Sequence, residues 1–189
     1  MNKSEFLQKF QYQRLMEPSH GSWPPSKLKA AAVLVPLVEK HNTLEVLLTK
    51  RASHLRHHGG QISFPGGKAE PWDESMIATA MREAQEEIGL SPDNVEIIGQ
   101  LNPYQTISGY IVTPVIGFVP GDLNYRADDN EVAEIFQVPL QHFLNSHNHR
   151  SVEATFKGHQ HQVHFMPYQN YNIWGATAAM LKDLAEHLI

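Results

Sequence analysis

Apolar residues recur along the chain at spacings typical of short helices and strands. Residues 4–16 have the spacing of an amphipathic helix. The β-branched and apolar run 30–38 predicts a buried strand. Residues 44–50 predict a second strand, and the polar turn between the two runs predicts a hairpin. The connector 17–27 is rich in Pro, Gly and Ser, so we expect the first helix to be joined by an irregular arm.

The rest of the chain mixes strands and helices. Residues 74–88 predict a helix that ends at Gly89, and residues 176–188 predict a closing amphipathic helix. Further strands are expected at 61–64, 95–101, 110–119, 131–138 and twice within 152–166, with a short helix from Pro139 through Phe143. This order predicts an α/β (α+β) fold with a central mixed β-sheet. We expect an N-terminal helix and Pro-rich arm over 1–29 and a single domain over 30–189.

Composition narrows the classes of function. The chain has 189 residues, 41% hydrophobic residues and no Cys, which excludes disulfides, thiolate metal sites and thiol nucleophiles. The net charge of −5 gives no general attraction to nucleic acid or to membranes. Neither a signal-peptide core nor a membrane-length apolar run is present, so we expect a soluble, cytoplasmic protein. Whether it forms a homodimer stays open.

The helix predicted near residue 80 carries an unusual group of acids. On a helical projection its apolar residues share one arc, and Glu83, Glu86 and Glu87 cluster beside that arc. The Glu83–Glu87 pair is an i,i+4 like-charge pair, and Glu86 and Glu87 lie in the last turn, where the helix dipole disfavours anions. A solvated acidic face is the ordinary alternative. The combined cost favours a bound divalent cation, Mg²⁺ or Mn²⁺, since carboxylates are its preferred ligands.

The segment Arg82-Glu83-Ala84-Gln85-Glu86-Glu87-Ile88-Gly89-Leu90, preceded by Gly67, resembles the signature of the Nudix hydrolase superfamily. Its early acidic position falls on either Asp73 or Glu74, because one extra residue separates Gly67 from Glu74. The resemblance implies an α/β/α sandwich and metal-dependent hydrolysis of a diphosphate. It also implies that Glu83 and Glu87 are metal ligands, that Glu86 is a ligand or a base, and that Arg82 orients the glutamates.

The upstream segment LLTKRASHLRHHGGQISFPGGK resembles the coenzyme A pyrophosphatase branch of that superfamily, in particular its bacterial NudL-type members. The resemblance implies cleavage of coenzyme A or a derivative to 3′,5′-ADP and 4′-phosphopantetheine. The residues then expected to bind the substrate are Arg51, Arg56, His58, Gln61, Lys68 and Gly67. Alternatives that stay open are a related hydrolase of ADP-ribose, NADH or nucleoside triphosphates, and a non-catalytic nucleotide sensor.

Two further sets of residues have alternative interpretations. Glu131 is a candidate for the base that activates water or for an extra metal ligand, and the alternative is an ordinary acid at a strand edge. The histidines near the predicted hairpin lack the spacing of a zinc site, so we expect them to be exposed hairpin residues. They are His147, His149, His159, His161 and His164.

Overall fold

The computed structural model describes residues 1–12, 28–55, 58–156 and 158–189. Four α-helices are present in these ranges, together with two short 3₁₀ helices. The α-helices are α1 (Lys3–Tyr12), α2 (Met76–Ile88), α3 (Leu140–Leu144) and α4 (Ala176–Leu188), and the 3₁₀ turns are η1 (Pro92–Asn94) and η2 (Ser146–Asn148).

The strands form one large mixed sheet and a separate hairpin. The strands are β1 (Lys29–Lys40), β2 (Thr43–Arg51), β3 (Ile62–Ser63), β4 (Gly66–Lys68), β5 (Glu96–Gln100), β6 (Tyr104–Gln105), β7 (Tyr110–Val119), β8 (Val132–Pro139), β9 (Arg150–Phe156) and β10 (His159–Phe165). The main path runs β3-β2-β1-β7-β5, with β4 on β1, β6 on β7 and β8 on β2. Only the β1–β7 pair is parallel among the described pairs, which confirms the mixed sheet.

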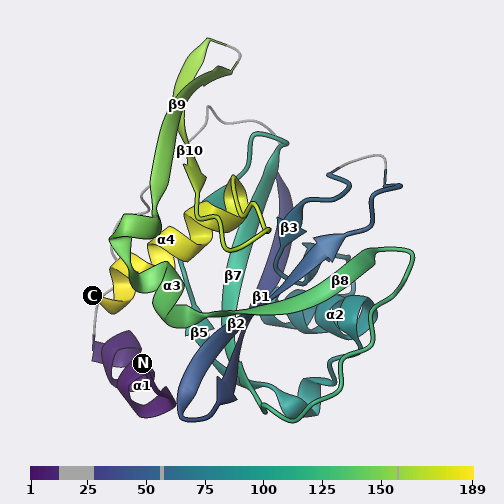
Figure 1. Ribbon diagram of the computed structural model, residues 1–189. Coiled ribbons are helices and arrows are strands. Elements are labelled where there is room, and N and C mark those ends of the chain that lie inside the picture. The colour runs from purple at the N-terminus through teal and green to yellow at the C-terminus, as the bar shows by residue number, and fades with distance from the viewer. Residues whose placement is uncertain (13–27, 56–57, 157) are drawn as a thin grey trace.

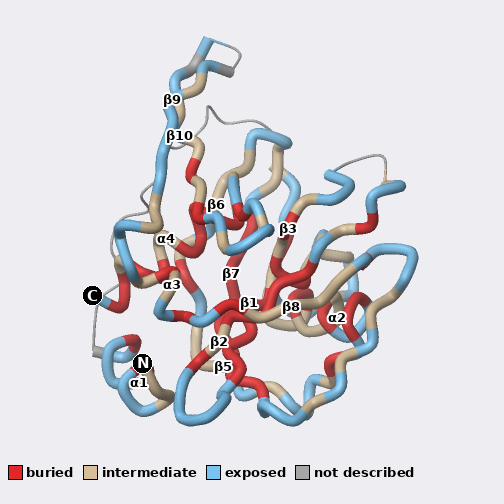
Figure 2. The backbone as a smooth tube through the Cα atoms, in the orientation of Figure 1, coloured by how far each residue is buried: buried red, intermediate tan, exposed pale blue. Residues whose placement is uncertain are grey.

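Strand β1 is buried on both faces, which explains its nearly continuous apolar sequence. Val35 and Leu37 point into a core shared with α1, α3 and α4, whereas Leu34 and Val38 point into a core shared with α2. Helix α2 therefore covers one face of the sheet, and the other helices cover the opposite face (Figure 1). Buried positions run along the central strands between these layers (Figure 2). The expected α/β/α sandwich is confirmed.

Helix α1 packs on the body of the protein. Phe6 is fully buried and meets Phe118 of β7 edge to face, with ring centroids 5.4 Å apart. The Lys9 ammonium donates to the carbonyl of Leu188 at 2.7 Å, and the His187 ring lies 4.7 Å from that of Phe10. The predicted residues 13–16 of this helix, and the Pro-rich arm, lie outside the described residues. The boundary between arm and domain at residue 30 stays a prediction.

The β9–β10 hairpin extends away from the sandwich (Figure 1). The expectation that its histidines are all exposed is wrong for His164, which is 2% exposed and forms a 2.8 Å hydrogen bond between Nδ1 and the Ser151 hydroxyl. The base of the hairpin is tied to the body, because the amide of Gly175 donates to the carbonyl of His164. None of the described helices is long and apolar enough to cross a membrane.

Candidate active site

Helix α2 ends at the predicted residue, Ile88, but begins at Met76, two residues later than predicted, because Ser75 caps its first turn. The Ser75 hydroxyl accepts a hydrogen bond from the amide of Ala78, which satisfies one free donor of the first turn. Gly89 follows the helix with φ 66°, a left-handed conformation that glycine adopts without strain. Ala80, Ala84 and Ile88 are buried against the sheet. This packing directs the acidic edge of the helix toward strand β4.

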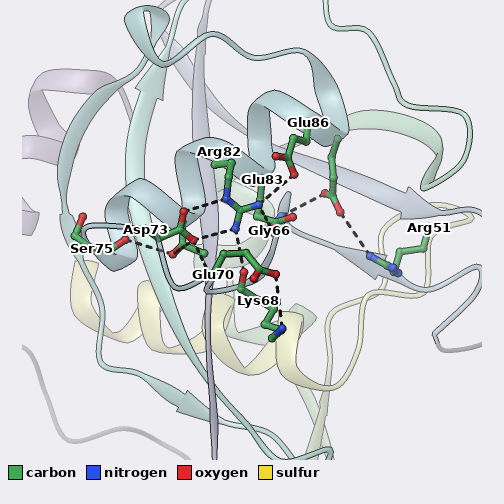
Figure 3. A network of polar contacts seen from close by, with 11 residues as sticks. Arg51, Gly66, Lys68, Glu70, Asp73, Ser75, Arg82, Glu83 and Glu86 are labelled. Atoms are coloured by element: carbon green, nitrogen blue, oxygen red, sulfur yellow. Dashed lines mark hydrogen bonds and ion pairs between the residues drawn. The ribbon is translucent and has the colours of Figure 1, made fainter.

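Arg82 is the centre of a polar network on this helix (Figure 3). Its guanidinium donates to both oxygens of Asp73 at 3.0 Å, to Glu83 Oε1 at 2.7 Å and to Glu86 Oε2 at 3.1 Å. A further bond reaches the carbonyl of Lys68 at 3.0 Å. The fork-like guanidinium suits such multiple contacts, and it holds Glu83 and Glu86 in defined positions.

Asp73, rather than Glu74, is the early acid that contacts Arg82. Its carboxylate is 4% exposed and also accepts from the Thr79 hydroxyl and the Glu70 amide, each at 2.9 Å. The hydrogen bonds from Arg82 come first among the causes that hold the pKa of Asp73 well below its usual range. The path of the 69–75 loop decides which of the two acids faces Arg82, and the spacing of residues alone does not reveal that path. The hydrogen bond from the buried Thr79 to Asp73 likewise becomes visible only in the structure.

Gly67 gives Glu83 its place beside the sheet. A Cβ at Gly67 would lie 2.5 Å from the carboxyl carbon of Glu83, so the carboxyl group occupies the space that any other residue would fill. Burial is the main cause that raises the pKa of Glu83, and the neighbouring charges of Glu86 and Glu131 add to it.

Glu87 is the most enclosed acid of the group, at 3% exposure. Its Oε2 accepts from the amide of Gly66 at 3.3 Å, and its Oε1 lies 3.6 Å from Nη1 of Arg51. The pKa of Glu87 is raised to about 8, and burial is the largest cause; the charges of Glu131 and Glu83 act in the same direction, whereas the hydrogen bond from Gly66 and the charge of Arg51 oppose the rise. Tertiary contacts from Arg51 and Arg82 thus supply part of the positive charge that these acids need.

Glu131 belongs to a loop that is tied to the end of α2. The amides of Arg126 and Asp128 donate to the free carbonyls of Ile88 and Glu87, each at 2.9 Å. The carbonyl of Glu131 then accepts from the amide of Ala52, just beyond β2, at 2.8 Å. These bonds bring the exposed carboxylate of Glu131 close enough for its charge to act on Glu83 and Glu87.

Of the side chains expected to bind the substrate, that of Arg51 contacts a glutamate of α2 directly, and the other described ones contact residues elsewhere. Arg51 contacts Glu87, and Lys68 lies 3.6 Å from Glu70 with its side chain 55% exposed. His58 Nδ1 lies 2.8 Å from Oε1 of Gln61, in a turn where His58 has φ 60°. Arg56 lies outside the described residues.

The donor set suits a hard divalent cation. Glu83, Glu86, Glu87 and Glu131 offer carboxylate oxygens, the ligands that Mg²⁺ and Mn²⁺ prefer, and burial is the main cause that raises the pKa values of Glu83 and Glu87. Among the described residues, no three acidic or histidine side chains already converge as a metal-binding group, so these glutamates would have to turn toward a bound ion.

Comparison with known proteins decides the family, because the NUDIX domain family matches residues 28–158. The chain belongs to the Nudix hydrolases. It is 44% identical to the uncharacterized Nudix hydrolase NudL of Enterobacter sp. (strain 638), over 96% of this chain and 92% of that protein. It is 40% identical to the NudL of Yersinia pestis (strain Pestoides F), over 98% and 94%. The expected bacterial NudL-type Nudix hydrolase, a diphosphatase, is confirmed.

Solved structures agree on the Nudix fold. A MutT/nudix family protein from Enterococcus faecalis superposes with a TM-score of 0.53 at 18% identity, over 98% of this chain and 68% of that chain. An Ap4A hydrolase from C. elegans gives 0.51 at 18% identity, over 59% and 80%. Nudix hydrolases generally use divalent metal ions, in keeping with the donor set on α2.

Proposed function

We propose that this Nudix hydrolase cleaves the diphosphate of coenzyme A or its derivatives, giving 3′,5′-ADP and 4′-phosphopantetheine or its acyl form. One observation carries the proposal. Two residues of the segment that resembles the coenzyme A branch, Arg51 and Gly66, contact Glu87 of the Nudix helix. The residues that mark the branch and those that mark the superfamily therefore belong to one site.

The proposed reaction is a direct attack of water on one phosphorus of the diphosphate, with cleavage of the bridging P–O bond. Glu83 and Glu87, with Glu86, are the proposed ligands of Mg²⁺ or Mn²⁺. Such an ion, when bound, neutralises charge on the phosphates and makes water more acidic. Arg82 keeps Glu83 and Glu86 in position, and Glu131 takes the proton from the attacking water. Glu86 is the alternative base.

The substrate requires positive charge from a protein that is negative overall. Coenzyme A carries a diphosphate and a 3′-phosphate, and arginine binds phosphate through two parallel hydrogen bonds. Arg51, Arg56, His58 and Lys68 are the proposed cationic or hydrogen-bonding contacts, with Gln61 and the backbone of Gly67 beside them. A cytoplasmic location and a homodimer remain predictions.

A substrate panel tests the proposal. The purified protein is incubated with coenzyme A, acetyl-coenzyme A, NADH, ADP-ribose and dGTP, with Mg²⁺ or Mn²⁺, in H₂¹⁸O, and the products are identified by mass. We expect preferred turnover of coenzyme A or its acetyl form, with one ¹⁸O in one of the two products. Preference for ADP-ribose, NADH or dGTP would overturn the coenzyme A assignment, and binding without turnover would indicate a sensor.

The role of Glu131 needs its own variant. Glu131→Gln removes the proposed base, and we expect kcat to fall by about 10²–10⁴-fold with little change in KM. Asp129→Asn is the matched control, since Asp129 is an exposed acid of the same loop. Equal, small effects of both variants would transfer the role of base to Glu86.

A further inference from the structure

The backbone holds Arg51 firmly at the last position of β2. Its amide donates to the carbonyl of Gln61 at 2.9 Å, and its carbonyl accepts from the amide of Gly60 at 3.0 Å. The register of β2 against β8 shifts between Lys50 and Arg51, where the strand pair ends. The side chain of Arg51 therefore extends from a fixed position in the sheet, and its guanidinium reaches Glu87 on α2.

The two arginines of the site are held very differently. Arg82 makes five hydrogen bonds, so moving it would break all of them. Arg51 lies 3.6 Å from Glu87, an ion pair longer than a hydrogen bond, and its buried Nε has no hydrogen-bond partner among the described residues. The side chain of Arg51 is 26% exposed, so part of it already borders solvent and can move outward.

The two oxygens of Glu87 have separate partners. Oε2 faces the fixed amide of Gly66, whereas Oε1 faces Arg51. Oε1 is therefore the oxygen best placed to receive another cation. A divalent cation held by Oε1 would face the positive charge of Arg51, and repulsion between charges of +2 and +1 at about 5 Å is worth on the order of tenfold in affinity even in water.

We infer that Arg51 and a divalent cation compete for Glu87, and that the displaced guanidinium becomes a ligand for a substrate phosphate. Arg51 thus balances the negative charge of Glu87 until the cation does so, and its planar guanidinium then binds the diphosphate. The competition involves Arg51, Glu87 and the divalent cation, and it needs no substrate. Only the second step, the transfer to phosphate, rests on the proposed diphosphatase function.

Binding of Mg²⁺ without substrate tests the competition. Isothermal titration at pH 8.5, which favours ionised carboxylates, compares the wild type with Arg51→Gln and Arg51→Lys. Lys50→Gln is the matched control, because it removes the same charge from the exposed neighbouring residue. We expect R51Q to bind Mg²⁺ about tenfold more tightly, with R51K and K50Q close to the wild type. Unchanged or weaker binding by R51Q would overturn the competition.

A double-mutant cycle gives a second readout that needs no turnover. In buffer with a chelator, R51Q should have a lower Tm than the wild type, because Glu87 loses its counter-charge. The double variant R51Q/E87Q should have the same Tm as E87Q, because the carboxylate that Arg51 balances is already absent. An equal decrease in both backgrounds would mean that Arg51 has only a structural role elsewhere, and would overturn the pairing on which the inference depends.

ADP serves as a diphosphate probe for the second step. With saturating Mg²⁺, R51Q should bind ADP about tenfold more weakly than the wild type or K50Q, which is the value of one charge-assisted contact. Unchanged ADP binding would overturn the transfer. Failure of the coenzyme A assay alone would overturn the proposed substrate and leave the Mg²⁺ and ADP results to stand.

Discussion

The backbone of Gly67 lies against the carboxyl group of Glu83, so that a methyl group at Gly67 would lie 2.5 Å from Cδ of Glu83. The adjacent Gly66 lies instead against the backbone of β1, with a methyl group 2.5 Å from the carbonyl oxygen of Ala32 and 2.6 Å from Cα of Val33. Two neighbouring glycines therefore serve different purposes. One leaves space for an acid of the site, and the other leaves space for a strand.

This difference predicts opposite results for two alanine variants. Gly67→Ala displaces a side chain that can rotate, so we expect a Tm near that of the wild type with a large loss of Mg²⁺ affinity and activity. Gly66→Ala meets backbone that cannot move easily, and we expect a loss of about 1–3 kcal/mol or more in the free energy of unfolding. Thermal denaturation and Mg²⁺ titration separate the two, and equal destabilisation by both would contradict the assignment.

Glu87 predicts a dependence of stability on pH. Its folded pKa of about 8 lies above its ordinary value of 4.5, so the native protein binds this proton more tightly than the unfolded chain. The free energy of unfolding therefore falls as pH rises through that interval. In chelating buffer, Glu87→Gln should have a higher Tm than the wild type at pH 8 and nearly the same Tm at pH 5.

The same variant should respond differently to metal and substrate. Mg²⁺ should raise the Tm of the wild type but not that of E87Q, and kcat should fall by several orders of magnitude while the fold survives. Glu86→Gln is a useful comparison, because the side chain of Glu86 is 59% exposed, so its removal should change the Tm in chelating buffer less than the removal of Glu87. Near-normal activity of E87Q would remove Glu87 from the site.

Asp73 and Glu74 should differ sharply on substitution. Asp73→Asn weakens the bonds to Arg82, and we expect lower activity together with a Tm lower by several degrees. Because the folded pKa of Asp73 is below its ordinary value, its stabilising effect is present at neutral pH and is lost only in strong acid. Glu74→Gln should be close to the wild type in both assays, and a reversal of this order would assign the early acidic position to Glu74.

Helix α1 should stabilise the fold without taking part in catalysis. Phe6→Ala removes a fully buried ring and should cost about 3–5 kcal/mol of unfolding free energy. The opposite face of the sheet carries α2, so kcat measured well below the Tm should stay within a factor of two or so of the wild type. Gln8→Ala, at an exposed position of the same helix, is the control for a general loss of helicity.

Local sequence signals predicted most elements because their causes are local. Ser75 and Gly89 fix the ends of α2 through bonds within one turn, and the β1–β2 hairpin follows from two apolar runs joined across His41 and Asn42, both with positive φ. The helical projection places Glu83, Glu86 and Glu87 together beside the apolar arc, and the structure then separates a buried Glu87 from an exposed Glu86. The expectation of an exposed His164 is wrong because the base of the hairpin is joined to the segment before α4, through the Gly175 amide and the His164 carbonyl, and the spacing of residues does not reveal this contact.

The sequence by itself determined the family, the acidic helix and the mixture of strands and helices, because each depends on particular residue types at fixed spacing along the chain. Only the tertiary structure decided that Asp73 rather than Glu74 meets Arg82, that Arg51 faces Glu87, and that the parallel β1–β7 pair forms the centre of the sheet. The physical reason is distance along the chain. Charges compensate one another over a few ångströms of space, and the fold, not the spacing of residues, decides which charges come that close.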